Sequence, residues 1–201
     1  GQVTTTTYDA AGRAVAVTNP LGETTTSVFD RANRKIAVIN PLLETNSTVY
    51  DAASRVIASI NPLGNRTTTA YDAANRPVSL LNPELERSST VYDHSGRTVN
   101  TINPLGFVTT TAYDKANRVI AVSNPEQETT TTVYDAASRI IGSVNPLGNR
   151  TTTSYDKADR PVSVLNAELE RSTTVYDAAG RTINTINALG YVPVLELDNG
   201  E

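Results

Sequence analysis

A Tyr-Asp pair with an arginine close behind it returns every 21 residues along this chain, and this repeat constrains the fold more than any other feature. One copy reads Tyr50-Asp51-Ala52-Ala53-Ser54-Arg55. The tyrosines are Tyr8, Tyr50, Tyr71, Tyr92, Tyr113, Tyr134, Tyr155 and Tyr176, and Phe29 takes the remaining position. The aspartates are Asp9, Asp30, Asp51, Asp72, Asp93, Asp114, Asp135, Asp156 and Asp177. The arginines are Arg13, Arg34, Arg55, Arg76, Arg97, Arg118, Arg139, Arg160 and Arg181. Repeat proteins bury their core between neighbouring units, so we treat residues 1–201 as a single array of nine units and a partial tenth.

The aspartate opens a predicted tight turn. Asp51 can accept hydrogen bonds from backbone N–H groups, as aspartate does at the first position of a β-turn. The fourth turn position is Gly, Asn, Ser or Asp in every unit, as at Ser54. Gly, Asn and Asp are the residues that best tolerate a positive φ. We therefore expect a type I turn that is followed by a residue in the left-handed region.

A strand is predicted after this turn. The segment Arg55-Val56-Ile57-Ala58-Ser59-Ile60 is rich in β-branched residues. Its third position is Val or Ile in every unit, and we expect this column to be buried. Its members are Val15, Ile36, Ile57, Val78, Val99, Ile120, Ile141, Val162 and Ile183.

The second half of the unit repeats the same plan. Asn61-Pro62-Leu63-Gly64 predicts a second turn, in which asparagine caps the first position and proline sets φ at the next. The segment from Asn65 to Tyr71 predicts a second strand, in which Thr67, Thr69 and Tyr71 share one face. We therefore predict an all-β fold: an antiparallel array of β-hairpins that curls into a spiral sheet or a tube. A parallel β-solenoid with one unit per coil is the alternative.

A longer period lies over the short one. A shift of 84 residues, which is four units, aligns residues 51–106 with residues 135–190 almost throughout. Either a block of four units was duplicated, or four units make one turn of a superhelix.

The chain also begins and ends inside a turn, which indicates a piece of a longer array. Pro193 and Glu196 set the last strand apart, and both residues discourage edge-to-edge growth of a sheet.

Composition excludes several classes of function. The net charge is −4 without a basic patch, so we expect no nucleic-acid partner. The absence of cysteine removes disulfides, thiolate metal sites and thiol catalysis. No apolar run approaches the ~20 residues of a membrane-spanning helix. The chain contains no signal peptide, so an export signal would lie upstream of Gly1.

The repeat resembles that of a known family. Tyr8-Asp9-Ala10-Ala11-Gly12-Arg13, together with its in-register copies, is similar to the YD repeats of RHS proteins and teneurins. The resemblance covers essentially the whole chain. It implies β-hairpins that join edge to edge in one sheet, which spirals into a hollow shell, often around a C-terminal toxin. It also implies an exported or cell-surface protein.

Two departures from the family bear on this expectation. Family shells use many more repeats than the nine of this chain, so this segment alone would not close around a cargo. The chain also contains nothing like the family's core motif and autoproteolytic site, and no toxin domain. The expected partners are therefore flanking repeats or other copies of the same array, with a glycan or cell-surface partner as a further possibility.

The repeated polar columns are the candidate sites. The aspartates form a potential metal ladder, but calcium requires six to eight oxygen ligands and each turn offers one carboxylate. Turn capping, with an ion pair to the arginine of the same turn, explains them better, and we expect no metal and no cofactor. We expect the tyrosines to pack as core, and the alternative is an aromatic strip that binds a glycan. His94 replaces alanine in a turn and is expected to be exposed.

A regular array of threonines suggests one further function. Thr-x-Thr pairs share a strand face and resemble the surface of ice-binding β-solenoids; they are Thr67 and Thr69, Thr109 and Thr111, Thr130 and Thr132, and Thr151 and Thr153. Threonine is also an ordinary β-former, which is the simpler explanation.

No motif for catalysis is present, so we expect no enzyme. The preferred hypothesis is a structural protein that forms an extracellular fibre, tube or shell segment. A fragment of a toxin-encapsulating or adhesion shell, and a glycan- or ice-binding surface, are the alternatives.

Overall fold

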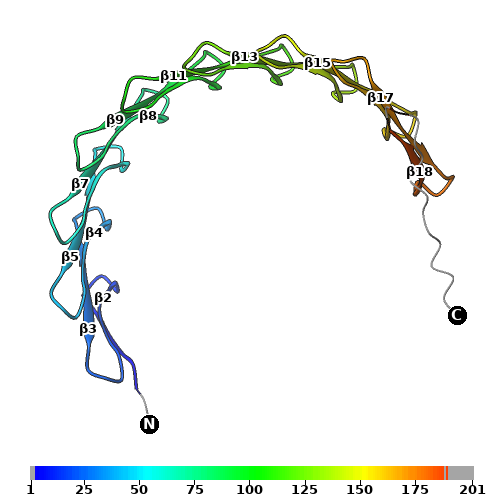
Figure 1. Cartoon of the computed structure of the whole chain (residues 1–201). Coiled ribbons are helices and arrows are strands. Elements are labelled where there is room, and N and C mark those ends of the chain that lie inside the picture. Colours follow the sequence, from blue (N-terminus) through cyan, green and yellow to red (C-terminus); the bar gives the residue numbers. More distant parts are fainter. Residues whose placement is uncertain (1–2, 188, 190–201) are drawn as a thin grey trace, which may run out of the picture. The chain divides into compact units, whose positions relative to one another are not determined.

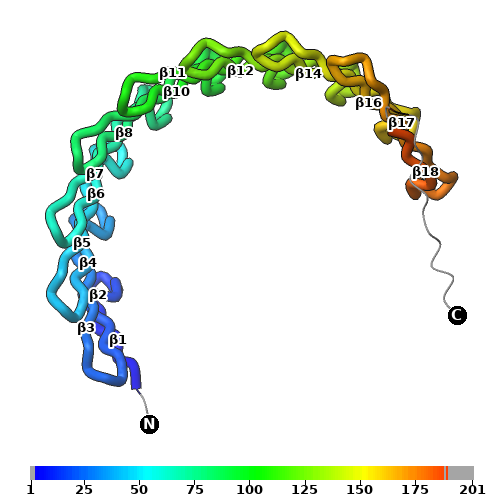
Figure 2. The backbone as a smooth tube through the Cα atoms, viewed as in Figure 1, coloured from blue at the N-terminus to red at the C-terminus, as the bar shows by residue number. Residues whose placement is uncertain are grey.

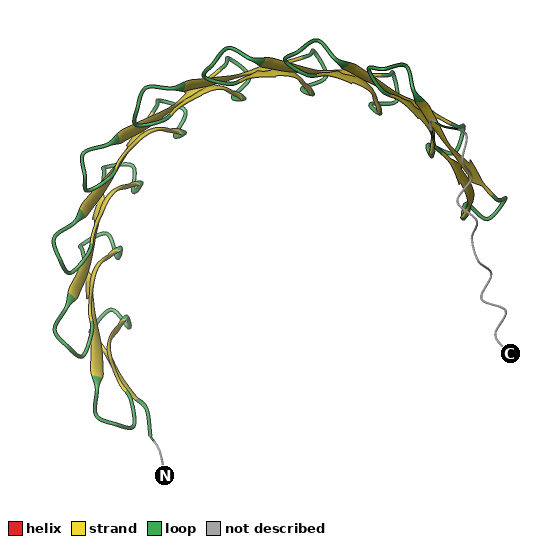
Figure 3. Ribbon diagram, in the orientation of Figure 1, coloured by secondary structure: helices red, strands yellow, loops and turns green. Residues whose placement is uncertain are grey.

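The structure is a computed structural model that describes residues 3–187 and residue 189. The described residues form eighteen β-strands joined by short turns and contain no helix (Figure 3). None of them therefore forms a helix that is long and apolar enough to cross a membrane. The predicted all-β class is confirmed.

The chain divides into two compact units, residues 1–107 and residues 108–201. Unit 1 contains β1 (Thr5–Tyr8), β2 (Ala14–Thr18), β3 (Thr24–Phe29), β4 (Lys35–Ile39), β5 (Thr45–Tyr50), β6 (Val56–Ile60), β7 (Arg66–Tyr71), β8 (Pro77–Leu81), β9 (Arg87–Tyr92) and β10 (Thr98–Ile102). Unit 2 contains β11 (Val108–Tyr113), β12 (Val119–Ser123), β13 (Thr129–Tyr134), β14 (Ile140–Val144), β15 (Arg150–Tyr155), β16 (Pro161–Leu165), β17 (Arg171–Tyr176) and β18 (Thr182–Ile186).

Within each unit, every strand pairs antiparallel with the strand that follows it in the chain (Figure 1). Short turns allow this order, because an antiparallel pair needs only a tight connection whereas a parallel pair needs a long crossover. The predicted hairpin array is therefore correct, and the alternative of a parallel β-solenoid is wrong.

The turn that begins with aspartate has the predicted backbone. The fourth residue of this turn has a positive φ in all nine units, for example 63° at Ser54 and 76° at Gly12. The N–H of Ser54 donates to the carbonyl of Asp51 at 3.1 Å, which closes the turn. The choice of Gly, Asn, Ser or Asp at this position therefore follows from the left-handed conformation that the residue adopts.

The second turn places leucine in the same left-handed conformation in three units. Leu43, Leu85 and Leu169 have φ values of 62° to 65°, at the position where Gly64 stands in another unit. A side chain with a Cβ is strained in this region by about 1–2 kcal/mol. These turns form nonetheless because asparagine caps them: the side chain of Asn82 accepts the N–H of Glu86 at 2.8 Å.

We expect Leu85→Gly to raise the free energy of unfolding by about 1 kcal/mol, because glycine adopts this φ without strain. The measurement is urea unfolding followed by circular dichroism. Leu63→Gly is the matched control, since Leu63 is equally exposed but has no positive φ. A gain of equal size in the control would show that the strain is not the cause.

A β-bulge recurs in every hairpin that an aspartate turn closes. In the β7–β8 hairpin, Ala70 pairs with Ser79 and Tyr71 pairs with Pro77, so Val78 is the extra residue. The same shift occurs beside every Val/Ile column residue in the described hairpins. Bulges bend a strand and increase its twist. The backbone of unit 1 accordingly bends in one direction from β2 to β9 (Figure 2).

The prediction that the Val/Ile column is buried is wrong. These side chains are half-buried, and that of Ile183 is 51% exposed. Two physical reasons account for this: the column falls on the bulge residue, and the described strands of each unit form a single layer of sheet. Ala58 is the one buried apolar residue among those that the structure describes.

The described residues leave three sequence predictions untested. The residues of the partial tenth unit, with Pro193 and Glu196, lie outside the described residues. The superhelical turn of four units stays a prediction, and so does the closure of the sheet into a spiral or tube.

Candidate functional site

The aspartate turn is held by one carboxylate that accepts several hydrogen bonds. Asp51 accepts the backbone N–H groups of Ala53 at 2.9 Å and of Arg55 at 3.0 Å on Oδ1. Its Oδ2 accepts the Nε of Arg55 at 2.6 Å, which forms the predicted ion pair within the turn. The short loop and the strand that follows it thus position the guanidinium.

The same guanidinium reaches into the following repeat. Nη1 of Arg55 donates to the carbonyl of Asp72 at 3.2 Å and to Oδ1 of Asn75 at 2.8 Å. Its Cζ lies 4.9 Å from the centre of the Tyr71 ring, at a cation–π distance. Arg55 therefore joins the turn of its own unit to the strand and the turn of the next.

The tyrosine closes the link between the two repeats. The hydroxyl of Tyr71 donates to the carbonyl of Val56 at 3.0 Å, which lies in the strand directly after Arg55. Other tyrosines donate in this way to the preceding repeat, among them Tyr50, Tyr92, Tyr155 and Tyr176. We call the connected aspartates, arginines and aromatic residues the Asp–Arg–Tyr ladder.

The ladder recurs with nearly constant geometry within each unit. Arginine Cζ atoms lie 4.5 to 4.9 Å from the ring of the next repeat at Arg13, Arg34, Arg55, Arg76, Arg118, Arg139 and Arg160. Tyr8 has no repeat before it in this chain and is 62% exposed. The ladder residues thus connect neighbouring repeats, and their tyrosines after Tyr8 are half-buried rather than enclosed in a core.

The fourth turn residue adds an acceptor to this link, which sequence reasoning missed. Arginine Nη1 donates to the side chain of this residue at Asn33, Ser54, Asn75, Ser138 and Asp159. Asp159 forms a second ion pair with Arg139 at 2.6 Å. Polarity at this position was attributed to turn conformation alone. The fixed spacing of 20 residues between the arginine and this acceptor is the signal that points to a contact between repeats.

Hydrogen bonding holds the pKa of every ladder aspartate below its usual value of 3.8. For the Asp51 carboxyl the main cause of the lowered pKa is the backbone N–H of Arg55, and the Arg55 guanidinium adds to it against the opposing effect of desolvation. The carboxylates are therefore charged at neutral pH and engaged within their own turns.

We expect acid to destabilise the array. Because the pKa of these carboxyls is lowered in the folded state, the unfolded chain binds more protons near pH 4. The stability that the carboxylates contribute is therefore complete above the unfolded pKa of about 3.9. It is lost as the pH falls through the folded pKa. Thermal melts should give a constant Tm from pH 7 to pH 5 and a falling Tm below about pH 4. Asp51→Asn keeps an amide oxygen as a cap and removes one titrating group, so its slope below pH 4 should be shallower. A Tm that rises on acidification would contradict this account.

The metal hypothesis for the aspartates has no geometric support in the part of the chain that the structure describes. Each carboxylate accepts donors from its own turn, and no group of three or more potential ligands gathers among the described residues. His94 lies exposed in its turn, as expected.

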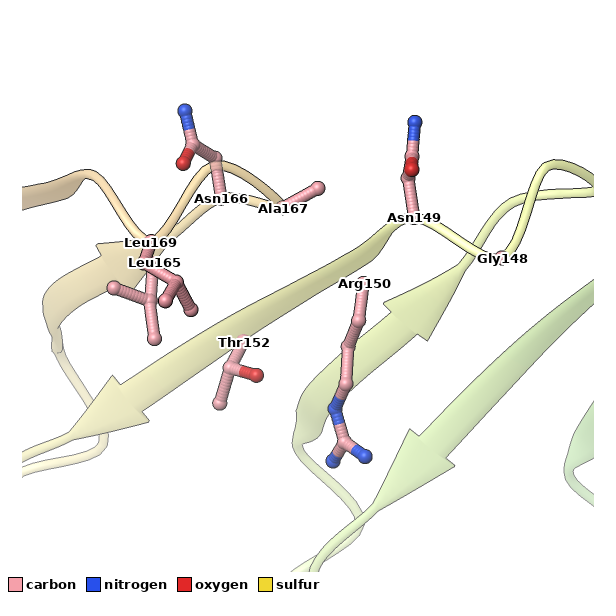
Figure 4. A pocket seen from close by; sticks show the side chains of 8 residues that line it. All are labelled: Gly148, Asn149, Arg150, Thr152, Leu165, Asn166, Ala167 and Leu169. Atoms are coloured by element: carbon pink, nitrogen blue, oxygen red, sulfur yellow. The ribbon is translucent and has the colours of Figure 1, made fainter.

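A shallow hollow lies beside the second turn in unit 2 (Figure 4). It is lined by the side chains of Arg150, Thr152, Leu165, Ala167 and Leu169, among others. Ala167 stands where most units carry proline. The hollow combines one cation with a mixed polar and apolar lining and brings together no set of catalytic groups.

Comparisons with known proteins agree with the observed repeat. A family model described as RHS Repeat matches residues 1–24, 8–44, 50–84, 92–129 and 134–171, which together exceed half of the chain. The comparison with curated proteins found no match.

Solved structures with a similar fold include the crystal structure of TcdB2-TccC3-TEV. It has a TM-score of 0.61 and 14% identity, over 92% of this chain and 11% of that chain. The pore of the Photorhabdus luminescens Tc holotoxin, with a mutation in TccC3, gives a TM-score of 0.53 and 14% identity, over 92% of this chain and 13% of that chain. The likeness establishes the fold, and this chain spans about a tenth of the length of either structure.

Proposed function

This chain belongs to the RHS-repeat family, and from that premise we propose that its function is structural: it is a segment of the wall of a shell, tube or fibre. The observation that carries the proposal is the Asp–Arg–Tyr ladder. The arginine of each repeat contacts the backbone and the aromatic ring of the next repeat, so the contacts that stabilise the array lie between repeats. A wall that lengthens by adding units needs this kind of contact.

The single-layer sheet supports the same proposal. A globular enzyme or receptor domain packs two or three layers around a core. Here one alanine, Ala58, is the buried apolar residue among those described, and the side-chain contacts join neighbouring repeats. The polar groups that would serve a reaction, the aspartates and arginines, are occupied by one another. We therefore propose a non-catalytic repeat region.

A wall that encloses a toxin is the second candidate. The names of the two similar structures, a TcdB2-TccC3 complex and a Tc holotoxin pore, favour it over an adhesion shell. A toxin-like coding sequence downstream of Glu201 in the gene would support it. An extracellular or cell-surface location remains part of this proposal.

The binding hypotheses have less support. A glycan that stacks on the tyrosines would have to share the rings with arginines, because an arginine already lies over one face of Tyr50, Tyr71 and Tyr92. Ice binding needs a flat threonine array, and Thr67 and Thr69 are half-buried. Both functions stay predictions from the sequence.

Electron microscopy of the purified chain across a concentration series tests the structural proposal. We expect continuous walls or filaments that lengthen with concentration and whose axial period follows the repeat. Discrete short particles at every concentration would contradict self-assembly by this chain and would leave the enclosing shell with flanking repeats as the candidate.

A further inference from the structure

The two kinds of turn line opposite rims of the sheet within each unit. Because successive strands run antiparallel, all aspartate turns fall on one rim and all second turns fall on the other, as the two rows of green turns in Figure 3 show. We call them the Asp-turn rim (residues 9–13 and their equivalents) and the Leu-turn rim (residues 19–23 and their equivalents).

Leucine side chains stand on the Leu-turn rim without any cover. In unit 1, each turn of the Leu-turn rim presents at least one leucine that is more than three quarters exposed. These leucines are Leu21, Leu42, Leu43, Leu63, Leu85 and Leu105. Single exposed apolar residues are ordinary, but a continuous row is not, and such rows mark interaction surfaces. In unit 2, Leu147 and Leu169 are exposed in the same way, whereas the turn at residues 124–128 carries no leucine.

The Leu-turn rim is also acidic. In unit 1 it carries four exposed glutamates, Glu23, Glu44, Glu84 and Glu86, and no basic residue, which gives a net charge of −4. In unit 2, Glu126, Glu128, Glu168 and Glu170 give the turns at 124–128, 145–149 and 166–170 the same net charge. Arginines begin four of the strands that follow these turns: Arg66, Arg87, Arg150 and Arg171.

The Asp-turn rim is small and basic. The ladder aspartates and arginines of unit 1 cancel in number, and Arg31 is then in excess, which leaves a net charge of +1. In unit 2, Lys115 and Lys157 stand at the position of Arg31, and with Asp159 on the same rim they also leave a net charge of +1. The tips of these turns are exposed alanines in most units, such as Ala52 and Ala53, which leave room for a larger side chain.

The two rims also match in spacing. On either rim one turn recurs at every second strand, which is about 10 Å by the usual strand separation. A rim of one kind laid along a rim of the other kind can therefore place a leucine turn against an aspartate turn at each repeat.

We propose that the Leu-turn rim of one copy of this chain docks on the Asp-turn rim of a second copy, with leucines on alanine turns and glutamates facing Arg31, Lys115 and Lys157. The proposal rests on the structural function proposed above and names the partner surface. The contact joins two different surfaces, so it does not close on itself, and copies stack without limit. The charges set the orientation, because like rims repel each other.

Two rim variants test this directly. The first carries Leu21→Ser, Leu63→Ser, Leu105→Ser and Leu147→Ser, which disable the Leu-turn rim. The second carries Arg31→Glu, Lys115→Glu and Lys157→Glu, which reverse the charge of the Asp-turn rim. All seven side chains are exposed, so both variants should fold, and circular dichroism melts check this. Sedimentation velocity is measured for each variant alone, for an equal mixture of them and for the wild type.

We expect each variant alone to sediment as a monomer at concentrations at which the wild type forms multimers. The mixture should form one-to-one dimers and nothing larger, because it contains one intact rim of each kind per pair. Dimers should weaken at least tenfold as salt is raised, since screening acts on exposed charges. Dimers of the second variant alone would show leucine rims that pair with each other and would overturn the proposal, as would a mixture without dimers.

The outcomes also separate this inference from the proposed function. If the wild type forms walls in the microscope while the mixture forms no dimers, the rim contact is wrong and the structural function stands. If the mixture forms dimers and the wild type forms multimers, but the microscope shows no continuous wall or filament with a period set by the repeat, the rim contact stands and the proposed wall is wrong.

Discussion

Replacing Arg55 with methionine should lower the free energy of unfolding by about 2 kcal/mol, although the side chain lies in a surface turn. The change removes hydrogen bonds to Asp72 and Asn75 and the contact with the Tyr71 ring. A hydrogen bond contributes about 0.5–1.5 kcal/mol net, and a partly exposed cation–π contact contributes about 0.5–1 kcal/mol. Methionine keeps the apolar part of the side chain, so the loss reports on the guanidinium. Urea unfolding of the whole chain measures it.

Arg66→Met is the matched control for this experiment. Arg66 begins strand β7, and its guanidinium makes one long contact, 3.4 Å from Nε to Oγ1 of Thr68. Surface substitutions without structural partners stay within about 0.5 kcal/mol, and we expect this one to do so. Equal losses in the two variants would show that the ladder adds no more than an ordinary surface arginine.

Deleting one complete repeat should leave the fold intact. Removal of residues 51–71 joins Tyr50 to Asp72, which restores the Tyr-Asp junction and allows Arg34 to serve the new neighbour as before. We expect a single cooperative transition with the Tm within a few degrees of the wild type. The m value should fall by about one ninth, because it scales with the surface that unfolding exposes.

Deleting half a repeat should be far more damaging. Removal of residues 51–60 takes out strand β6 and its turn and places Tyr50 where Ile60 pairs with Arg66. Every later side chain then moves to the other face of the sheet relative to those before the junction. We expect a loss of about 3 kcal/mol or more, which corresponds to roughly 6–12 °C in Tm. A half-repeat variant as stable as the complete-repeat variant would mean that the 21-residue unit is not the structural unit.

Local chemistry explains which parts of the fold could be predicted. The aspartate turn, its positive φ and its ion pair involve residues within five positions of one another, so the sequence of one unit suffices to predict them. The antiparallel order follows from turns that are too short for a crossover. The second turn was also predicted, but the leucines with positive φ were not, because leucine has no preference for that region.

The contacts between repeats could not be predicted in the same way. Placing Arg55 over Tyr71 requires the register between β6 and β7, which does not follow from one turn alone. The burial of the Val/Ile column was predicted from its apolar, β-branched side chains in every unit. In a single-layer array the column has no second layer to face, and its regularity reflects the bulge instead.

The row of exposed leucines could not be predicted for a different reason. Leu63 stands in a turn whose other residues explain the turn fully, so nothing in the sequence required a role for it. Its exposure, and the row that it forms with Leu21 and Leu105, become visible only when alternate turns are placed on one rim.

The central claim is that contacts of the Asp–Arg–Tyr ladder between neighbouring repeats stabilise the array. A series of arrays of different length tests this claim most directly. Arrays of five, seven and nine repeats, cut at Tyr-Asp junctions, would be unfolded in urea under one set of conditions. We predict that the free energy of unfolding rises by a constant increment per repeat, and that the increment shrinks when each array carries methionine at the ladder arginines. A free energy that does not change with length, or an increment that is the same without the arginines, would contradict the account.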